Sequence, residues 1–256
     1  MMFSIFGREV KSYFLSPVAY VVTASFVLFA SASFYYRAVA FPGMLGSAAS
    51  SGFLDVLKQN RINYFVLSPM LNDVVFILMF LIPVMTMRLW SEEKRASTDE
   101  LLLTSPISVS RIIIGKYLAG LLFVSVLLLL TFIHVGFLFY YASPDPGVTF
   151  ASYAGLFLFI ATAVAVGLFT STLTANPIIA SVVCLIIELI LTTLYGVGYS
   201  IKSPDLGRAI SYISWKYHML DMSDGIIGSG DLIYFAGMIF IWLFLAYQSV
   251  ESSRWR

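Results

Sequence analysis

Six long apolar runs, separated by polar residues, dominate the pattern of hydrophobic and polar positions along the chain. About 20 helical residues are needed to cross the hydrocarbon core of a bilayer. Runs of about that length or longer cover residues 18–36, 69–88, 112–141, 153–173, 177–199 and 232–250. Pro83 lies inside the second run and is expected to kink it. The pattern predicts an all-α, polytopic membrane protein with six transmembrane helices in one domain over residues 1–256.

The residues before the first run have an amphipathic pattern. Large apolar side chains recur at helical spacing in residues 1–16, whereas Arg8, Glu9 and Lys11 fall elsewhere on the helical wheel. The apolar members are Phe3, Phe6, Val10, Tyr13 and Phe14. This pattern predicts an N-terminal interfacial helix that lies in the membrane surface, with a frayed tail as the alternative.

Composition agrees with a membrane location. Hydrophobic residues make up 59% of the chain and charged residues 11%, and the mean hydropathy of +0.90 far exceeds that of a soluble domain. This composition makes membrane lipid the expected surrounding of the chain. The net charge of +1 gives no reason to expect a nucleic acid partner. Cys184 is the one cysteine, and one chain can therefore form neither a disulfide nor a thiolate metal site.

Basic residues indicate the orientation. If the N-terminus is cytoplasmic, nine of the 15 Lys and Arg residues lie in inner segments and six in outer ones. Cytoplasmic loops are enriched in Lys and Arg, so this placement is favoured. Both termini are then expected in the cytoplasm.

The most highly charged stretch is MRLWSEEKRASTDELLLTSPIS, residues 87–108, between the second and third runs. Ser97 to Glu100 has the spacing of a capping box, in which Glu100 bonds back to the start of a new helix. The helix should end before Pro106, because the residue before proline avoids helical geometry. Its apolar residues are Leu101, Leu102 and Leu103. Exposed leucines beside charges suit a protein surface, so residues 91–107 are expected to hold a short cytoplasmic docking helix, with a plain connecting loop as the alternative.

Residues 87–120, MRLWSEEKRASTDELLLTSPISVSRIIIGKYLAG, resemble the signature of the type-2 ABC transporter permeases, and most of all the gliding-motility-type permeases. The shared features are a Glu-Glu-Lys/Arg turn, a Thr-x-Glu-Leu-Leu helix, a Pro-x-Ser/Thr break and a Gly-Lys pair that opens the third span. The surface N-terminal helix and the six runs extend the resemblance over nearly the whole chain. Many relatives have glycine where this chain has Ser97 or Thr98, a departure at the start of the short helix.

The resemblance implies one transmembrane permease domain that serves as the membrane subunit of an ATP-binding cassette exporter in the bacterial cytoplasmic (inner) membrane. Its coupling helix would dock into a separate ABC ATPase subunit, which would bind ATP and Mg. A second permease copy or a paralogue would complete the translocation pathway as a dimer. The implied docking residues are Glu92, Glu93, Lys94, Arg95 and Glu100 as polar contacts, and Leu101, Leu102 and Leu103 as the apolar anchor.

The residues agree that the chain is not itself an ATPase. A phosphate loop, G-x-x-x-x-G-K-[ST], occurs nowhere in the sequence, since Gly115-Lys116 is followed by Tyr117 and lacks the first glycine. No cofactor or metal is expected in this chain. The motifs H-E-x-x-H and G-x-S-x-G are also missing, which argues against an intramembrane enzyme.

Three further polar positions, one of them a possible cluster, need separate interpretations. Glu188 falls near the middle of the fifth run, where it could line the pathway or an interface, or could be a protonated carboxyl bonded to a neighbouring helix. His134 is expected to make a packing contact or a hydrogen bond. His218 with Asp221 and Asp224 could bind a metal, but a solvated loop is favoured there.

An ATP-independent secondary transporter or channel is the alternative function. Such a protein should carry polar residues or broken helices at matched positions in several spans. Only Glu188 and Pro83 qualify, so the permease of an ATP-driven exporter is the favoured interpretation.

Overall fold

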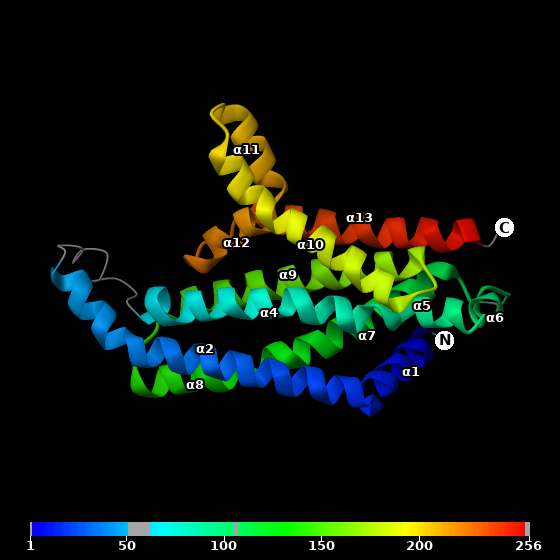
Figure 1. The fold of residues 1–256 in the computed structure, drawn as a ribbon, viewed down its shortest axis with the longest axis horizontal. Coiled ribbons are helices and arrows are strands. Elements are labelled where there is room, and N and C mark those ends of the chain that lie inside the picture. The colour runs from blue at the N-terminus through cyan, green and yellow to red at the C-terminus, as the bar shows by residue number, and fades with distance from the viewer. Residues whose placement is uncertain (1, 51–61, 105–106, 254–256) are drawn as a thin grey trace.

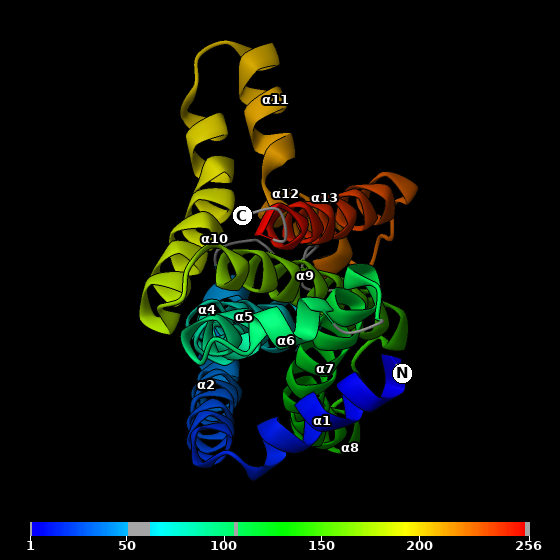
Figure 2. The ribbon, with the colours of Figure 1, turned by 90° about the vertical axis from the view of Figure 1, so that its right-hand side faces the viewer.

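The computed structural model describes residues 2–50, 62–104 and 107–253, and the elements in these ranges are helices, without a strand (Figures 1 and 2). They are α1 (Met2–Leu15), α2 (Pro17–Ser50), the π-helical turn η1 (Asn63–Leu67), α4 (Ser68–Thr86), α5 (Arg88–Arg95), α6 (Asp99–Thr104), α7 (Val109–Leu130), α8 (Phe132–Tyr141), α9 (Pro146–Leu173), α10 (Pro177–Ser200), α11 (Pro204–Ile213), α12 (Trp215–Ser223) and α13 (Ser229–Ser253). The all-α prediction is confirmed.

Six of the described segments are long and apolar enough to cross a membrane, as predicted. They are Pro17–Gly43, Asn63–Arg95, Val109–Tyr141, Pro146–Leu173, Pro177–Ser200 and Ser229–Ser253. Several extend beyond the predicted apolar runs because a helix continues to its capping residue. Asp145 and Asn176 accept hydrogen bonds from the amides of the first turns of α9 and α10, with a proline at the first helical position of each.

Helix α9 is the centre of the bundle. In its most apolar part 78% of the residues are buried, against 17% to 44% in the other five spans. It packs against α4, α7, α10, α12 and α13. Small side chains permit this close packing, as at Ala163, Ala165 and Gly167, and Thr86 of α4 fills the space where a Gly167 side chain would stand.

The two chain ends and α6 lie at the same end of the bundle (Figure 1). There α1 lies across α7, so the predicted N-terminal helix is confirmed as a helix. Its aromatic face packs on the protein itself, because Tyr13 stacks on Phe123 with ring centroids 5.3 Å apart and Phe14 meets the same ring at 5.6 Å. The amphipathic pattern therefore reflects contact with α7 as well as any contact with lipid.

Two spans are interrupted. The second contains Pro83 inside α4 and breaks at Met87, where α4 ends and α5 begins. The third breaks at Thr131 between α7 and α8, where the hydroxyl donates to the Leu128 carbonyl at 2.6 Å and lies 2.8 Å from the Tyr153 hydroxyl of α9. A hydroxyl that bonds the preceding turn bends a helix. The predicted third span is therefore present, but it consists of two helices, α7 and α8.

Helices α11 and α12 form a returning pair before the last span. α10 and α11 form a hairpin that projects sideways from the bundle (Figures 1 and 2). The chain then turns at Ser214 and α12 packs along α9, with the Trp215 ring 4.9 Å from the ring of Phe159. Met222 and Gly225 face Gly155 and Val148 nearer the start of α9, so α12 runs back toward the end of the bundle opposite the termini.

His218 fixes this pair to the last span. Its side chain is 1% exposed, with Nδ1 2.7 Å from Asp231 Oδ1 and Nε2 3.0 Å from the Tyr212 carbonyl oxygen. The expected solvated loop is therefore wrong here, since the residue is buried in a helix. The metal set with Asp221 and Asp224 is wrong as well, because both ring nitrogens already have other partners.

The α10–α11 hairpin yields a stability prediction. A Cβ on Gly198 would stand 2.6 Å from the Gly207 carbonyl oxygen, whereas one on Gly196 would meet nothing within 4 Å. Gly198→Ala should therefore lower the free energy of unfolding by about 1–3 kcal/mol, as other overpacked contacts do. Thermal unfolding in detergent measures the effect. Gly196→Ala is the matched control and should be neutral or slightly stabilising; equal melting temperatures of the two variants would refute the close contact.

Candidate functional site

A buried lysine joins three helices at the end of the bundle that carries the termini. Lys116 of α7 is 1% exposed, and its Nζ lies 3.0 Å from Glu9 Oε1 of α1 and 3.1 Å from Glu93 Oε1 of α5. The ammonium also donates to the Leu89 carbonyl at 2.5 Å and lies 5.7 Å from the centre of the Trp90 ring. A buried charge is stable only when paired and hydrogen-bonded. Lys116 thus holds α1 and α5 against α7.

Arg8 completes this group at the surface. Its guanidinium lies 2.9 Å from Glu93 and 3.1 Å from Glu9. Partial burial by itself lowers the pKa of Arg8, but the hydrogen bonds and charges of Glu9 and Glu93 outweigh this and raise it, so the guanidinium stays charged. Two cations and two carboxylates balance each other here. We refer to Arg8, Glu9, Glu93 and Lys116 as the ion cluster.

The charged residues of α5 divide into two sets. Glu93 belongs to the ion cluster, and Lys94 donates to the Thr172 carbonyl at 2.6 Å, where its charge suits the C-terminal end of α9. Glu92 and Arg95 face outward; Glu92 is 54% exposed and pairs with Arg88 of the preceding turn at 3.5 Å. Glu93 and Lys94 therefore hold α5 in place, while Glu92 and Arg95 lie at the surface.

The link between α5 and α6 depends on one unusual residue. Ser97 has a φ of +54°, in the left-handed region, and its amide bonds the Lys94 carbonyl while the Thr98 amide bonds the Glu93 carbonyl. This pair of bonds is a Schellman motif that ends α5. The predicted capping-box role of Ser97 is wrong, because the Leu102 amide bonds the Thr98 carbonyl and Thr98 is thus the residue that precedes α6.

The predicted short helix is present as α6, Asp99–Thr104, between the second and third spans. Glu100 is exposed on it. Leu102 is half-buried and packs against the protein's own core, so it is less exposed than the sequence suggested. The side chains of Leu101 and Leu103 lie outside the described part of the structure.

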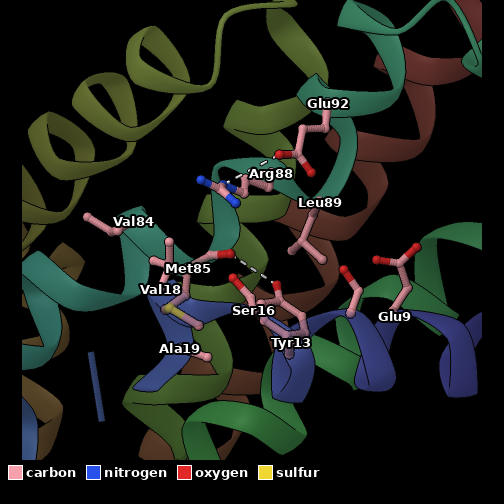
Figure 3. A pocket seen from close by; sticks show the side chains of 11 residues that line it. Glu9, Tyr13, Ser16, Val18, Ala19, Val84, Met85, Arg88, Leu89 and Glu92 are labelled. Atoms are coloured by element: carbon pink, nitrogen blue, oxygen red, sulfur yellow. Dashed lines mark hydrogen bonds and ion pairs between the residues drawn. The ribbon is translucent and has the colours of Figure 1, made fainter. Parts of the chain in front are cut away.

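A small cleft of about 60 Å³ lies where α1, α2, α4 and α5 meet (Figure 3). Glu9 and Glu92 line it from opposite sides, and the Tyr13 hydroxyl donates to the Met85 carbonyl at 3.0 Å. Burial, and then the charges of Glu9 and Glu92, raise the pKa of Tyr13, so its hydroxyl stays protonated as the donor. The cleft has room for no more than a few water molecules. The hydrogen bond from Tyr13 to Met85 joins α1 to the second span.

Glu188 lies away from this site. It is fully buried in α10, where Oε1 accepts from the Cys184 thiol at 3.5 Å. A role in the pathway or at an interface stays a prediction. The hydrogen bond expected of His134 is confirmed, because its Nε2 lies 3.0 Å from the Ser31 hydroxyl of α2.

The ion cluster contains residues that sequence reasoning did not place in the site. Arg8 and Glu9 were expected only on the polar face of a surface helix, and Lys116 only at the inner end of the third span. A signal was present, since Lys116 stands alone within an apolar run and an ionisable residue in that position usually has a partner. Its partners lie 107 and 23 positions away, which the sequence does not reveal.

Comparison with known proteins gives one family match. The family model described as "ABC-2 type transporter" matches residues 2–227, which include the ion cluster, α6 and α12. No curated protein matches this chain.

Removing the charge of Lys116, at the centre of the ion cluster, should greatly lower the free energy of unfolding. Lys116→Met should leave Glu9 and Glu93 with Arg8, whose side chain is 57% exposed, as the remaining cation of the cluster. Removing one partner of a buried ion pair costs about 3–5 kcal/mol, and the partial exposure of both carboxylates places this variant toward the lower end. Thermal unfolding of the purified protein measures the loss.

Arg111→Met is the matched control, because Arg111 is exposed near the start of the same helix. Adding Glu93→Gln to Lys116→Met should recover part of the lost stability, since residues in contact show non-additive effects. If Lys116→Met unfolds at the temperature of the Arg111→Met control, the cluster does not hold these helices together.

At Ser97, the residue with the left-handed backbone, a substitution is expected to stabilise the protein. Ser97→Gly should stabilise the end of α5 by about 1 kcal/mol, because glycine adopts a positive φ at little cost. The measurement is hydrogen exchange of the Thr98 amide, which bonds Glu93 and should exchange more slowly. Ser97→Val should speed that exchange; the reverse order would contradict the left-handed conformation.

Proposed function

The chain belongs to the ABC-2 type transporter family, whose members are the transmembrane components of ABC transporters, and we propose that it couples to a separate ATPase subunit through α6. Subunits of this family are generally not enzymes themselves, in keeping with the lack of a phosphate loop in the sequence. ATP and Mg would bind to the partner. α6 is suited to docking because it lies at the tip of the bundle between two spans (Figure 1).

The observation that carries this proposal is the ion cluster. A push on α6 reaches α5 through the short turn at Ser97, and α5 is the last part of the second span, after the break at Met87. α5 cannot separate from α7 without exposing or unpairing Lys116, so α1, α5 and α7 should move together. The docked ATPase would therefore displace a group of helices rather than a loop.

The proposed contact set follows from the two faces of α5. Glu92, Arg95 and Glu100 are exposed and would form the polar contacts. Glu93 and Lys94 were expected to contact the ATPase directly, and we now assign them the task of positioning α5. Leu101 and Leu103 remain the proposed apolar anchor, and the exposed part of Leu102 would add to it.

We also propose the orientation and the assembly. Both termini and α6 lie at one end of the bundle, and the excess of basic residues favours the cytoplasm for this end (Figure 1). The resemblance of residues 87–120 to the permeases suggests a bacterial inner membrane. A second copy or a paralogue would form the pathway with this chain as a dimer, and the projecting α10–α11 hairpin offers exposed apolar side chains for that contact. Among them are Ile186, Ile190, Tyr199, Leu206 and Tyr212.

Export is the proposed direction, and the likeness of residues 87–120 to gliding-motility-type permeases suggests the subgroup. The family membership favours this ATP-driven mechanism over the ATP-independent carrier or channel. Two of the six spans are interrupted, at Met87 and Thr131, and the interruptions do not fall at matched positions of two halves as inverted repeats would place them.

Co-purification with the ATPase subunit tests the coupling. Arg95→Glu reverses an exposed charge beside α6 and should reduce recovery of the ATPase at least several-fold, while the protein still reaches the membrane at a normal level. Charge reversal at an interface places like charges together and weakens the complex. The purified chain alone should hydrolyse no ATP.

Lys202→Glu is the matched control, an equal charge reversal in the link between α10 and α11 and away from α6, and it should leave recovery unchanged. Full recovery of the ATPase with Arg95→Glu, Glu92→Lys and Glu100→Lys alike would exclude this face of α5 and α6 as the docking site.

A further inference from the structure

A cleft of about 400 Å³ opens between α4, α10 and α12, in the half of the bundle away from the termini. This volume is within the range of pockets that bind small molecules. Apolar side chains line most of it, including Val75, Phe76, Met79, Met219 and Leu220. It is separate from the ion cluster and from α6.

The polar groups of Trp215 and Thr192, which line the cleft, are already hydrogen-bonded within the protein. The indole nitrogen of Trp215 donates to the Thr192 hydroxyl at 2.7 Å, and that hydroxyl bonds the Glu188 carbonyl at 2.8 Å. Trp215 is 1% exposed and Met79 is 3% exposed, so both are fixed by packing. Because these polar groups are already hydrogen-bonded and the other side chains are apolar, the cleft can accommodate a hydrocarbon chain.

A positive charge stands at the rim. Lys216, in the first turn of α12, is exposed and lines the cleft, and its Nζ lies 5.7 Å from the centre of the Tyr195 ring. It forms no ion pair with any residue that the structure describes. The nearest acidic residue on α4, Asp73, is already paired with Arg37 at 2.6 Å. A cation without a carboxylate partner, beside an apolar cleft, is complementary to an anionic amphiphile.

We propose that this cleft binds one anionic membrane lipid. An acyl chain lies along Val75, Met79 and Met219, and the phosphate of the headgroup meets Lys216. Asn72 at the same rim offers an amide to that phosphate. Binding is a property of this chain alone and does not depend on the proposed coupling to an ATPase.

Photo-cross-linking in vesicles tests the site. The full chain is reconstituted in phosphatidylcholine with a trace of phosphatidylglycerol that carries a photoactivatable group on one acyl chain, or with the phosphatidylcholine that carries the same group. The anionic probe should label α4 and α12 peptides at the cleft several-fold more than the zwitterionic probe. Lipid-facing positions elsewhere, such as Ile133 on α8, should label equally with both.

Lys216→Gln should abolish the preference for the anionic probe, and Lys202→Gln, an exposed lysine outside the cleft, should keep it. Val75→Trp should fill the cleft and remove labelling there by either probe. Equal labelling of the cleft by both probes in the unaltered chain, or a preference that survives Lys216→Gln, overturns the proposal. Because the assay contains no ATPase subunit, a failure here leaves the coupling proposal standing, and the reverse also holds.

Discussion

A lysine ammonium enclosed by apolar helices has to keep its charge compensated, and Lys116 achieves this with carboxylates from two other helices. The arrangement at this end of the bundle depends on that requirement. α1 contributes Glu9 and α5 contributes Glu93, so the N-terminal helix and the charged segment after the second span are held against the third span. Arg8 balances the second carboxylate and keeps the group neutral as a whole.

The ion cluster gives the exposed residues near α6 a rigid support. Lys94 adds a bond to the end of α9, the central helix, and the Tyr13 hydroxyl ties α1 to the end of α4. The short helix itself is joined to α5 by a tight left-handed turn at Ser97. A docked subunit would thus act on spans two and three and on the bundle centre at once. The other half of the protein is built differently, because α11 packs on α10, α12 folds back on α9, and His218 and Asp231 fix α12 to α13.

Much of the fold could be predicted from the sequence. Apolar runs long enough to cross a bilayer gave the six spans, and helical spacing gave α1, because both signals are local. The charged segment with its three leucines gave the position of α6. The break at Thr131 was missed, since it arises from a hydroxyl that bonds both its own helix and Tyr153 of another. The helices α11 and α12 were also not predicted, because they contain few apolar residues. Their main anchor, the contact of Trp215 with Phe159, joins segments that are distant in the sequence.

For the candidate site, the sequence by itself determined the segment and its chemistry: a polar island with a short helix, placed at one end of a membrane bundle. Only the tertiary structure decided which charged side chains bond to other helices of the protein and which are exposed at its surface. Glu92, Glu93, Lys94 and Arg95 are adjacent in sequence, yet the middle two turn inward because Lys116 and the Thr172 carbonyl lie on that side of α5. The energy of a charged side chain depends on its partners and its burial, and both are set by helices that the local sequence does not contain.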